Sequence, residues 1–340
     1  MYTESAKTLT GKKRSDWERF LASASLKPDI DTDQTVTVWD DDEMIASGSR
    51  KGNLLKCIAV DPAHQGEGLT ATVLTELKQE AFREGHKKLF LYTKPRNRML
   101  FSPLFFYPVA QTNQVLLMES TRNGIADFLK KLSPDPAADR LEMKIDPEKA
   151  HIIGCIVMNA DPFTAGHRYL VEQAARDCGC LYVFVLSEDK GTFSAEERMA
   201  LVLEGTKDLP NVKVYPTGEY LISSATFPKY FLKDRETAQR EHYLLDLAVF
   251  TQHFVPHFGI THRYAGTEPT CAVTGGYNRA MAEILPKHGV AFVEVPRKQE
   301  LNTAISASTV RREMQTGNLE TLRKLVPTST FNHIKKKIQG

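Results

Sequence analysis

Between residues 150 and 296, short runs of apolar residues alternate regularly with segments of helical periodicity. The runs are HIIGCIVM (151–158), LYVFVLSED (181–189), VKVYPTG (212–218), HRYAGTE (262–268) and VAFVEVP (290–296). Strands that are apolar throughout and separated by helices form a parallel sheet with both faces covered. Ligands of such sheets bind beyond the carboxyl ends of the strands, so we expect the chemistry directly after a strand.

A segment rich in Pro, Asp and Ala, residues 133–150, separates this region from the first part of the chain. At 340 residues the chain is long enough for two domains. We place the boundary near residue 147, which predicts domains over 1–146 and 147–340. The first domain has a mixed α+β pattern, in which strand LLKCIAV (54–60) precedes a helical segment and further strands.

Charge and apolar content exclude two classes of partner. With 44 Lys and Arg against 42 Asp and Glu, the net charge of +2 is too balanced for a main partner that is a nucleic-acid backbone. No apolar stretch approaches the roughly 18 residues of a membrane helix, and the polar start lacks the apolar core of a signal peptide. We therefore expect no nucleic-acid partner, no membrane segment and a cytoplasmic location.

Five cysteines, an odd number, are interpreted as reduced and mostly buried thiols. Cys178 and Cys180 lack the CxxC spacing, and Pro256 interrupts the run of His253, His257 and His262. Neither set is typical of a zinc site, so we predict that these cysteines and histidines bind no metal and name no metal ligand from the sequence.

The segment NADPFTAGH (159–167) follows the first strand of the second domain. It places Thr164, Gly166 and His167 where a helix should begin, and exposed amides at a helix start favour phosphate. Gly166 permits close backbone approach, and the hydroxyl and imidazole are donors for oxygens that gain charge. Asn159 and Phe163 share this turn and complete the predicted nucleotide-binding set. A lone histidine can instead be a capped or packed residue.

A second segment, ISASTVRR (305–312), places hydroxyls before a short helix and guanidinium groups one turn later. Ser306, Ser308 and Arg311 could bind a polyphosphate chain. The alternative is an ordinary serine cap with a solvent-facing arginine.

Two further loops are weaker candidates. After the strand ending near 268, Gly266 offers close approach and Glu268 is an acceptor or a metal carboxylate, although a simple polar turn has the same pattern. A possible substrate channel is bordered by Ser223, Ser224, Thr226 and Lys229.

Together, the 159–167 and 305–312 segments resemble the TxGH and ISSTxxR signatures of the nucleotidylyltransferase superfamily. The resemblance implies a Rossmann-like (HUP-type) α/β domain in which the α-phosphate of ATP is attacked and pyrophosphate leaves. It also implies that Thr164 and His167 contact the triphosphate while Ser306, Ser308 and Arg311 hold the departing phosphates, usually with Mg2+.

In the first domain, strand 54–60 leads into DPAHQGEGLT and a helix. This resembles the acyl-CoA pyrophosphate loop of GNAT acetyltransferases, and implies a GNAT-like domain with Gln65, Gly66 and Gly68 at the pyrophosphate. Thr70 stands where that pattern has a small residue. A purely structural glycine turn is the alternative.

The order of the two domains resembles that of the citrate lyase ligase family, and so do four sequence segments: IGCIVMNADPFTAGHRYLVEQAA, ISSATFPKYFLK, GTEPTCAVTGGYN and ISASTVRR. Such an enzyme is an AMP-forming acid-thiol ligase that uses ATP, Mg2+ and acetate. Through acetyl-AMP it acetylates the thiol of the CoA-like prosthetic group on the acyl carrier subunit of citrate lyase, which activates the lyase. We further expect the loop at Gln65 to dock that CoA-like arm.

Two other functions stay open from the sequence. One is adenylyl transfer to a phosphorylated small molecule, and the other is acetyl transfer from acetyl-CoA by the GNAT-like domain. The sequence does not distinguish oligomeric states or a carrier-binding surface.

Overall fold

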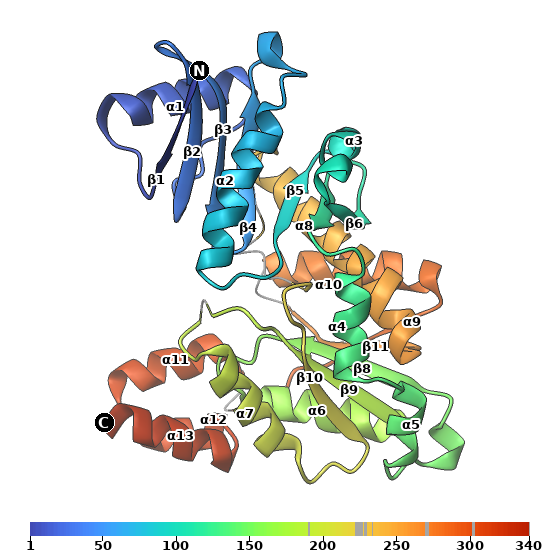
Figure 1. Cartoon of the computed structure of the whole chain (residues 1–340). Coiled ribbons are helices and arrows are strands. Elements are labelled where there is room, and N and C mark those ends of the chain that lie inside the picture. Colours follow the sequence, from blue (N-terminus) through green and yellow to red (C-terminus); the bar gives the residue numbers. More distant parts are fainter. Residues whose placement is uncertain are drawn as a thin grey trace. The chain divides into compact units, whose positions relative to one another are not determined.

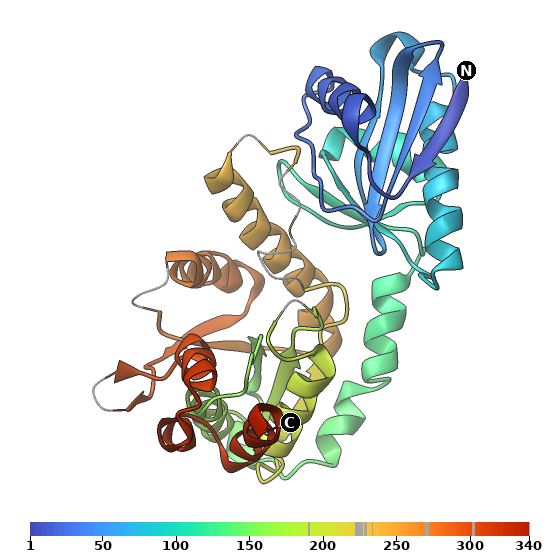
Figure 2. The ribbon, with the colours of Figure 1, turned by 90° about the vertical axis from the view of Figure 1, so that its left-hand side faces the viewer.

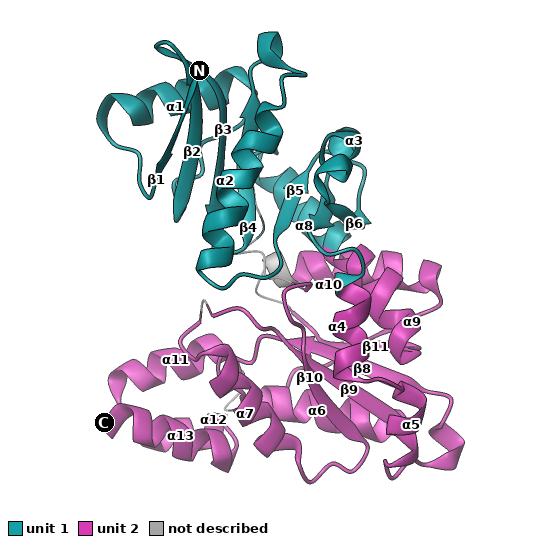
Figure 3. Cartoon of the chain, viewed as in Figure 1, with its two compact units in different colours: residues 1–124, 227–245 teal, residues 125–226, 246–340 magenta. Residues whose placement is uncertain are grey.

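The computed structural model describes residues 1–189, 191–221, 227, 230–232, 234–268, 272–300 and 303–339 (Figure 1). The chain forms two compact units (Figure 3). Unit 1 comprises residues 1–124 and 227–245, and unit 2 comprises 125–226 and 246–340. These units differ from the predicted ranges at 125–146 and 227–245. The units are defined by contacts within the folded chain, whereas the predicted domains, 1–146 and 147–340, are parts expected to fold independently. These domain ranges therefore stay a prediction.

Contacts within each unit explain both differences. In unit 2, Arg140 donates to the carbonyl oxygen of Phe258 at 3.1 Å, and His257 Nε2 lies 3.0 Å from the carbonyl oxygen of Ser133. In unit 1, Tyr230 donates through its hydroxyl to the carbonyl oxygen of Tyr92 at 3.2 Å. Each segment is therefore held by the unit to which it belongs.

The sheet of unit 1 has seven strands in the order β1-β2-β3-β4-β5-β7-β6. The strands are β1 Tyr2–Ala6, β2 Gln34–Asp40, β3 Glu43–Lys51, β4 Leu54–Val60, β5 Phe90–Thr93, β6 Tyr107–Gln111 and β7 Leu116–Glu119. Strands β4 and β5 pair parallel, and all other neighbouring strands of this sheet pair antiparallel. Among described residues, the β4–β5 ladder consists of Leu54 with Phe90 and Leu55 with Leu91. The next residue of β5, Tyr92, lies beyond this ladder, and its carbonyl oxygen accepts the hydroxyl of the buried Tyr230.

Helices α1 (Gly11–Ser23) and α2 (Leu69–Arg83) cover opposite faces of this sheet. Adjacent residues of β3 show this, because successive side chains of a strand point to opposite faces. Ser47 accepts from Trp17 of α1 at 2.9 Å. At Gly48 a Cβ would lie 2.5 Å from Val73 of α2, so this close helix approach requires glycine. The short helices are η1 Pro62–His64, η2 Pro95–Asn97, α3 Arg98–Phe101 and η3 Ser102–Leu104.

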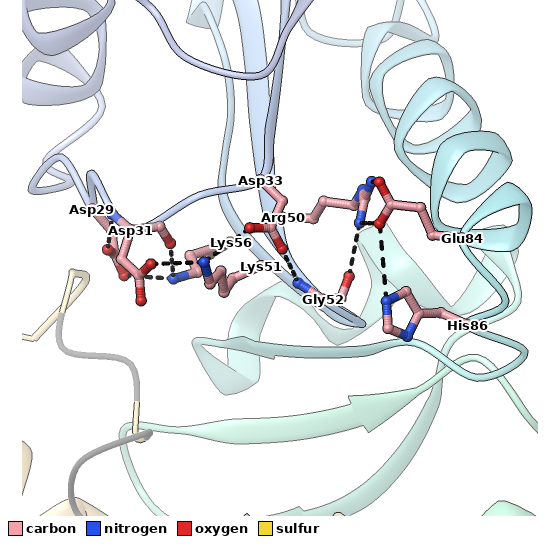
Figure 4. A network of polar contacts seen from close by, with 9 residues as sticks. All are labelled: Asp29, Asp31, Asp33, Arg50, Lys51, Gly52, Lys56, Glu84 and His86. Atoms are coloured by element: carbon pink, nitrogen blue, oxygen red, sulfur yellow. Dashed lines mark hydrogen bonds and ion pairs between the residues drawn. The ribbon is translucent and has the colours of Figure 1, made fainter. Parts of the chain in front are cut away.

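A buried arginine joins β3 to the end of α2 (Figure 4). Arg50 is fully buried, donates to Gln34 at 2.8 Å and pairs through both terminal nitrogens with Glu84 at 2.7 Å. Nearby, Lys56 pairs with Asp29 at 3.0 Å. A buried charge is tolerated only when it is paired. These ion pairs therefore fix the positions of Arg50 on β3 and Lys56 on β4.

The sheet of unit 2 is parallel, with strand order β10-β9-β8-β11-β12. Its strands are β8 Ile153–Met158, β9 Cys180–Val185, β10 Val212–Pro216, β11 His262–Gly266 and β12 Ala291–Val295. The order reverses between β8 and β11, which is the position where doubly wound sheets bind ligands. A separate pair consists of β13 Gln299–Glu300 and β14 Thr303–Ala304.

Helices cover both faces of that sheet, as Figures 1 and 2 show. Helices α6 and α7 pack on one side, together with α12 and α13. On the other side, Phe254 and Phe258 pack against Phe184 of β9. Helix α8 Arg235–Val249 belongs to unit 1 up to residue 245 and to unit 2 from residue 246. The other helices of this part of the chain are α4 Gly124–Leu132, α5 Pro136–Leu141, η4 Pro147–Lys149, α6 Ala165–Asp177, α7 Ala195–Thr206, the π-helical turn η5 Phe250–Phe254, α9 Val255–Phe258, α10 Ala272–Ile284, η6 Leu285–His288, α11 Ala307–Thr316, α12 Leu319–Leu325 and α13 Thr328–Gln339.

The predicted α/β class is confirmed, with a mixed α+β first part and a parallel sheet in the second. The five apolar runs of the second part coincide with β8 to β12. Among the residues described, no helix combines the length and apolarity needed to cross a bilayer.

Candidate active site

The turn between β8 and α6 carries the first predicted motif at the carboxyl edge of the unit 2 sheet. Thr164 is the N-cap of α6, with extended backbone angles of −101° and 167°. Its hydroxyl accepts the amide of His167 at 3.2 Å, while Nδ1 of His167 accepts the amide of Thr164 at 3.0 Å. This reciprocal capping box fixes the helix start and the orientation of the imidazole.

The capping box also sets the protonation of His167. Because Nδ1 accepts a backbone amide, the ring hydrogen of the neutral form resides on Nε2. Burial, with a contribution from the nearby positive charge of Arg297, lowers the pKa of His167 from 6.5 to about 4. At neutral pH the side chain is therefore an uncharged donor through Nε2, which suits an oxygen that gains negative charge.

Two amides at the start of α6 remain available for an anion. The hydroxyl of Thr164 accepts the amide of His167, and its carbonyl oxygen accepts the amide of Arg168. No described residue accepts from the amides of Ala165 and Gly166. A Cβ at Gly166 would lie 3.2 Å from the carbonyl oxygen of Ile305. The glycine therefore allows the second motif to lie against the first.

The second motif begins α11 beside this turn. Ser306 is the N-cap and accepts the amide of Thr309 at 3.1 Å, so its hydroxyl serves the helix. Arg311 reaches back to the first motif, where Nη1 donates to the carbonyl oxygen of Asp161 and lies 3.5 Å from its carboxylate. Nη2 donates to the hydroxyl of Ser308 at 3.2 Å. The side chain of Arg311 is 34% exposed, so its cation faces solvent in part.

A second arginine follows β12. Arg297 donates through Nε to the carbonyl oxygen of Thr267 at 2.7 Å and pairs with the carboxylate of Glu268. Gly266 precedes these residues on β11, and a Cβ there would meet Arg297 at 3.8 Å, an ordinary contact. Glu268 thus holds a cation rather than standing as an isolated carboxylate.

The structure therefore brings the predicted residues of both motifs together at the point where strand order reverses. Two helix N-termini, an uncharged imidazole donor and two arginines lie around the 159–167 turn. Helix N-termini and guanidinium groups both stabilise bound phosphate oxygens. The arrangement is suited to a polyphosphate.

Asn159 and Phe163 occupy supporting positions in the same turn. Asn159 is exposed, and both its carbonyl and side-chain oxygens accept from Arg198 at 2.8 and 2.6 Å. Phe163 is fully buried and stacks on His167 with ring centroids 5.9 Å apart. The predicted roles of these side chains toward a nucleotide stay predictions.

Three residues that shape the site were missed by sequence reasoning, namely Asp161, Arg198 and Arg297. Arg198 is fully buried on α7 and also donates to the carbonyl oxygen of Glu188, so it joins the loops after β8 and β9. Burial lowers its pKa. Arg297 could have been found, because it follows a predicted strand by two residues, whereas Arg198 lies inside a helix and gives no positional signal.

The predicted loop of unit 1 lies between η1 and α2. Gly66 and Gly68 have φ of +94° and +78°, and a Cβ at either would meet no atom within 4 Å. Gly68 is the N-cap of α2 and has no side chain to occupy the first amides. Gln65 is exposed beside them. The backbone angles thus favour glycine at both positions, and the space beside the helix start is open.

Four cysteines, Cys57, Cys155, Cys178 and Cys180, are unpaired and buried, as predicted. Burial raises the pKa of each, to between about 11 and about 12, so they are poor nucleophiles. Cys271 and the predicted channel residues 223, 224, 226 and 229 lie outside the described residues. Within the described ranges, no three His, Cys, Asp or Glu side chains are grouped as a metal site.

Comparison with known proteins gives matches in both parts of the chain. Residues 153–334 match the family described as the citrate lyase ligase C-terminal domain, and residues 12–100 match the GNAT acetyltransferase family. Three curated relatives, each named citrate (pro-3S)-lyase ligase, are similar over nearly the full length. The Klebsiella pneumoniae protein is 38% identical over 95% of this chain and 92% of its own length.

The Haemophilus influenzae relative is 39% identical over 96% of both chains. The Escherichia coli relative is 36% identical over 96% of this chain and 92% of its own. The match to the C-terminal family includes both the 159–167 and the 305–312 segments.

Proposed function

The chain belongs to the citrate lyase ligase family, and from this premise we propose that it acetylates the prosthetic-group thiol of the citrate lyase acyl carrier subunit, at the expense of ATP. The observation that supports this most directly is the meeting of both motifs around His167 in a chain that matches its relatives over 95–96% of its length. Adenylyl transfer to a phosphorylated small molecule and acetyl transfer from acetyl-CoA do not fit these relatives.

In the first step, an oxygen of acetate attacks the α-phosphorus of ATP, the bond to the β-phosphate breaks, and pyrophosphate leaves. Acetyl-AMP forms. His167 donates through Nε2 to the phosphate that gains charge, and the amides of Ala165 and Gly166 share this task. Arg311 and the start of α11 hold the pyrophosphate. One well-aimed donor contributes roughly 3 kcal/mol to such a transition state.

In the second step, the carrier thiolate attacks the acetyl carbonyl, the bond to the AMP oxygen breaks, and AMP leaves. Adenylation turns a poor leaving oxygen into a good one, so no acyl intermediate on a protein side chain is needed. The high pKa values of the buried cysteines agree with this, because none of the four supplies a thiolate at neutral pH.

The described residues of the site suit phosphate oxygens, but they offer no set of side-chain ligands for Mg2+. Asp161 accepts the amides of Thr192 and Phe193 and pairs with Arg311, while Glu268 pairs with Arg297. Both carboxylates are thus engaged, and the described residues build no protein cage for the ion. Mg2+ in phosphoryl-transfer sites is usually bound by substrate phosphates together with one or two carboxylates, so a bound ion would depend mainly on the triphosphate here.

The exposed loop of unit 1 supports a second part of the proposal. The start of α2, which has no side-chain cap, and the open space at Gly66 and Gly68 suit the pyrophosphate of the CoA-like arm. The pair Gly68→Asn and Gly68→Asp tests this, since both side chains tolerate positive φ and differ in charge. We expect a higher KM for the carrier in G68D than in G68N. Equal values would count against arm docking.

The main experiment incubates the full chain with Mg-ATP, acetate and thiol-form citrate lyase. We expect AMP and pyrophosphate to form in step with restored lyase activity, and both to be lost in His167→Ala. A dinucleotide product, or acetylation from acetyl-CoA without ATP, would instead support one of the two alternatives.

A further inference from the structure

Unit 1 carries a group of exposed side chains on η2, α3 and the end of η3, called here the 96–105 patch. Its members are Arg96, Arg98, Met99, Leu100 and Phe105. Met99 is 76% exposed, Phe105 68% and Leu100 48%. Large apolar side chains that are exposed together, with charged neighbours, are typical of contact surfaces.

The backbone under the patch is fixed. Phe101 and Phe106 are buried, and their rings meet edge to face at 6.4 Å. Lys78 of α2 donates to the carbonyl oxygen of Leu104 at 2.9 Å. The core contacts of this segment are therefore made by other residues, and the apolar side chains of the patch are not needed for them.

Phe105 adds an independent observation. It has φ of +62° and ψ of +39° where η3 ends, a left-handed conformation that favours glycine and is uncommon for a bulky side chain. Its ring is exposed, so burial does not compensate for the backbone conformation. The left-handed turn ends η3, because the amides of Phe105 and Phe106 donate to the carbonyl oxygens of Ser102 and Phe101 at 3.2 Å. Glycine would make the same turn at lower cost, so the turn does not account for a large exposed ring at position 105.

The charge of the region indicates what kind of partner fits. Residues 94–118 include Lys94, Arg96 and Arg98 and contain no Asp or Glu. Within the described part of the chain, no acid pairs with Arg96 or Arg98, whereas Arg50, for example, is held by Glu84. A surface that is both basic and apolar complements a protein face that presents acidic and apolar side chains.

We propose that the 96–105 patch docks the acyl carrier subunit of citrate lyase through an acidic face of that subunit. This inference rests on the proposed function, which requires a carrier protein to reach the chain. Phe105 and Met99 supply the apolar centre of the contact, and Arg96 and Arg98 attract the carrier from solution.

Phe105→Gly in the full chain is the sharpest test, because glycine suits the backbone at 105 and removes only the exposed ring. We expect unchanged or higher thermal stability and a KM for thiol-form carrier about tenfold higher. Direct binding of the carrier should weaken by a similar factor. Acetate-dependent exchange of pyrophosphate into ATP, measured without carrier, should not change. Phe82→Ala, which removes another half-exposed ring of unit 1, is the matched control.

The charged part is tested with Arg96→Gln/Arg98→Gln. The KM of the native chain for carrier should rise with ionic strength, and the rise should be smaller in the double variant. The docking proposal is overturned if F105G binds carrier as the native chain does. It is also overturned if F105G changes the sedimentation mass of the chain while carrier binding stays the same, since the patch would then join two copies. Absence of exchange in the native chain would refute the proposed function instead, because carrier binding is measured separately.

Discussion

Replacing His167 separates two tasks that the structure assigns to one side chain. The imidazole accepts the amide of Thr164 in the capping box, and it presents Nε2 as a donor. His167→Ala removes both, whereas His167→Glu keeps an acceptor at the position where capping boxes favour Glu. Only the second substitution leaves the helix start intact while it replaces the donor by a negative charge.

The expected magnitudes follow from these contacts. Thr164 is 1% exposed, so loss of its amide partner in H167A should lower the free energy of unfolding by about 1 kcal/mol, or about 2–4 °C in Tm. H167E should lose less stability than H167A, because it keeps the capping acceptor and its charge lies near Arg297 and the positive end of α6. Loss of one donor to the α-phosphate costs about 3 kcal/mol, which predicts pyrophosphate exchange at least about 100-fold slower in both variants.

The assay is acetate-dependent exchange of labelled pyrophosphate into ATP, with urea unfolding of each variant in parallel. His167→Gln serves as the matched control, since it keeps both the capping acceptor and an amide donor and should be intermediate in rate. If H167E exchanges pyrophosphate within about threefold of the native rate, His167 acts only as a cap and the reasoning is refuted.

Three further predictions concern unit 2. Because burial and Arg297 lower the pKa of His167 to about 4, the unfolded chain binds a proton that the folded chain does not bind between about pH 4 and 6.5. The free energy of unfolding should therefore decrease as the pH is lowered from 6.5 to 4, more steeply than in H167Q, as measured by urea midpoints. In Arg311→Lys the ammonium cannot reproduce the two contacts of the guanidinium with Asp161 and Ser308, so the rate of pyrophosphate exchange should fall about tenfold or more. An unchanged exchange rate would argue against phosphate binding by Arg311. Gly205→Ala would place a Cβ 2.5 Å from the buried ring of Phe163, which should cost about 1–3 kcal/mol in urea unfolding; no loss of stability would contradict the packing described here.

Much of the fold could be predicted from local pattern. Strands β8 to β12 coincide with the five apolar runs, and helix α6 begins one residue before Gly166, as the motif suggested. Continuous apolar runs and capping residues are local signals, because each reports on burial or on backbone amides within a few residues.

The candidate site was only partly predictable. The two motifs could be found because each lies at a helix start after a strand or turn. Arg198 could not, since an arginine within a helical pattern is usually solvated, and only the packing of α7 carries it beneath the 159–167 turn. Glu268 was predicted as an acceptor, and its pairing with Arg297 depends on the adjacency of β11 and β12.

The sequence alone determined the parallel sheet, the two helix starts with their hydroxyl caps, and the residue types that suit phosphate, because these depend on neighbours along the chain. Tertiary structure alone decided that Gly166 lies against Ile305, that Arg311 reaches Asp161 across 150 positions, and that His167 stays uncharged. Burial and charge at a site are sums over groups distant in sequence, so they exist only once the chain has folded.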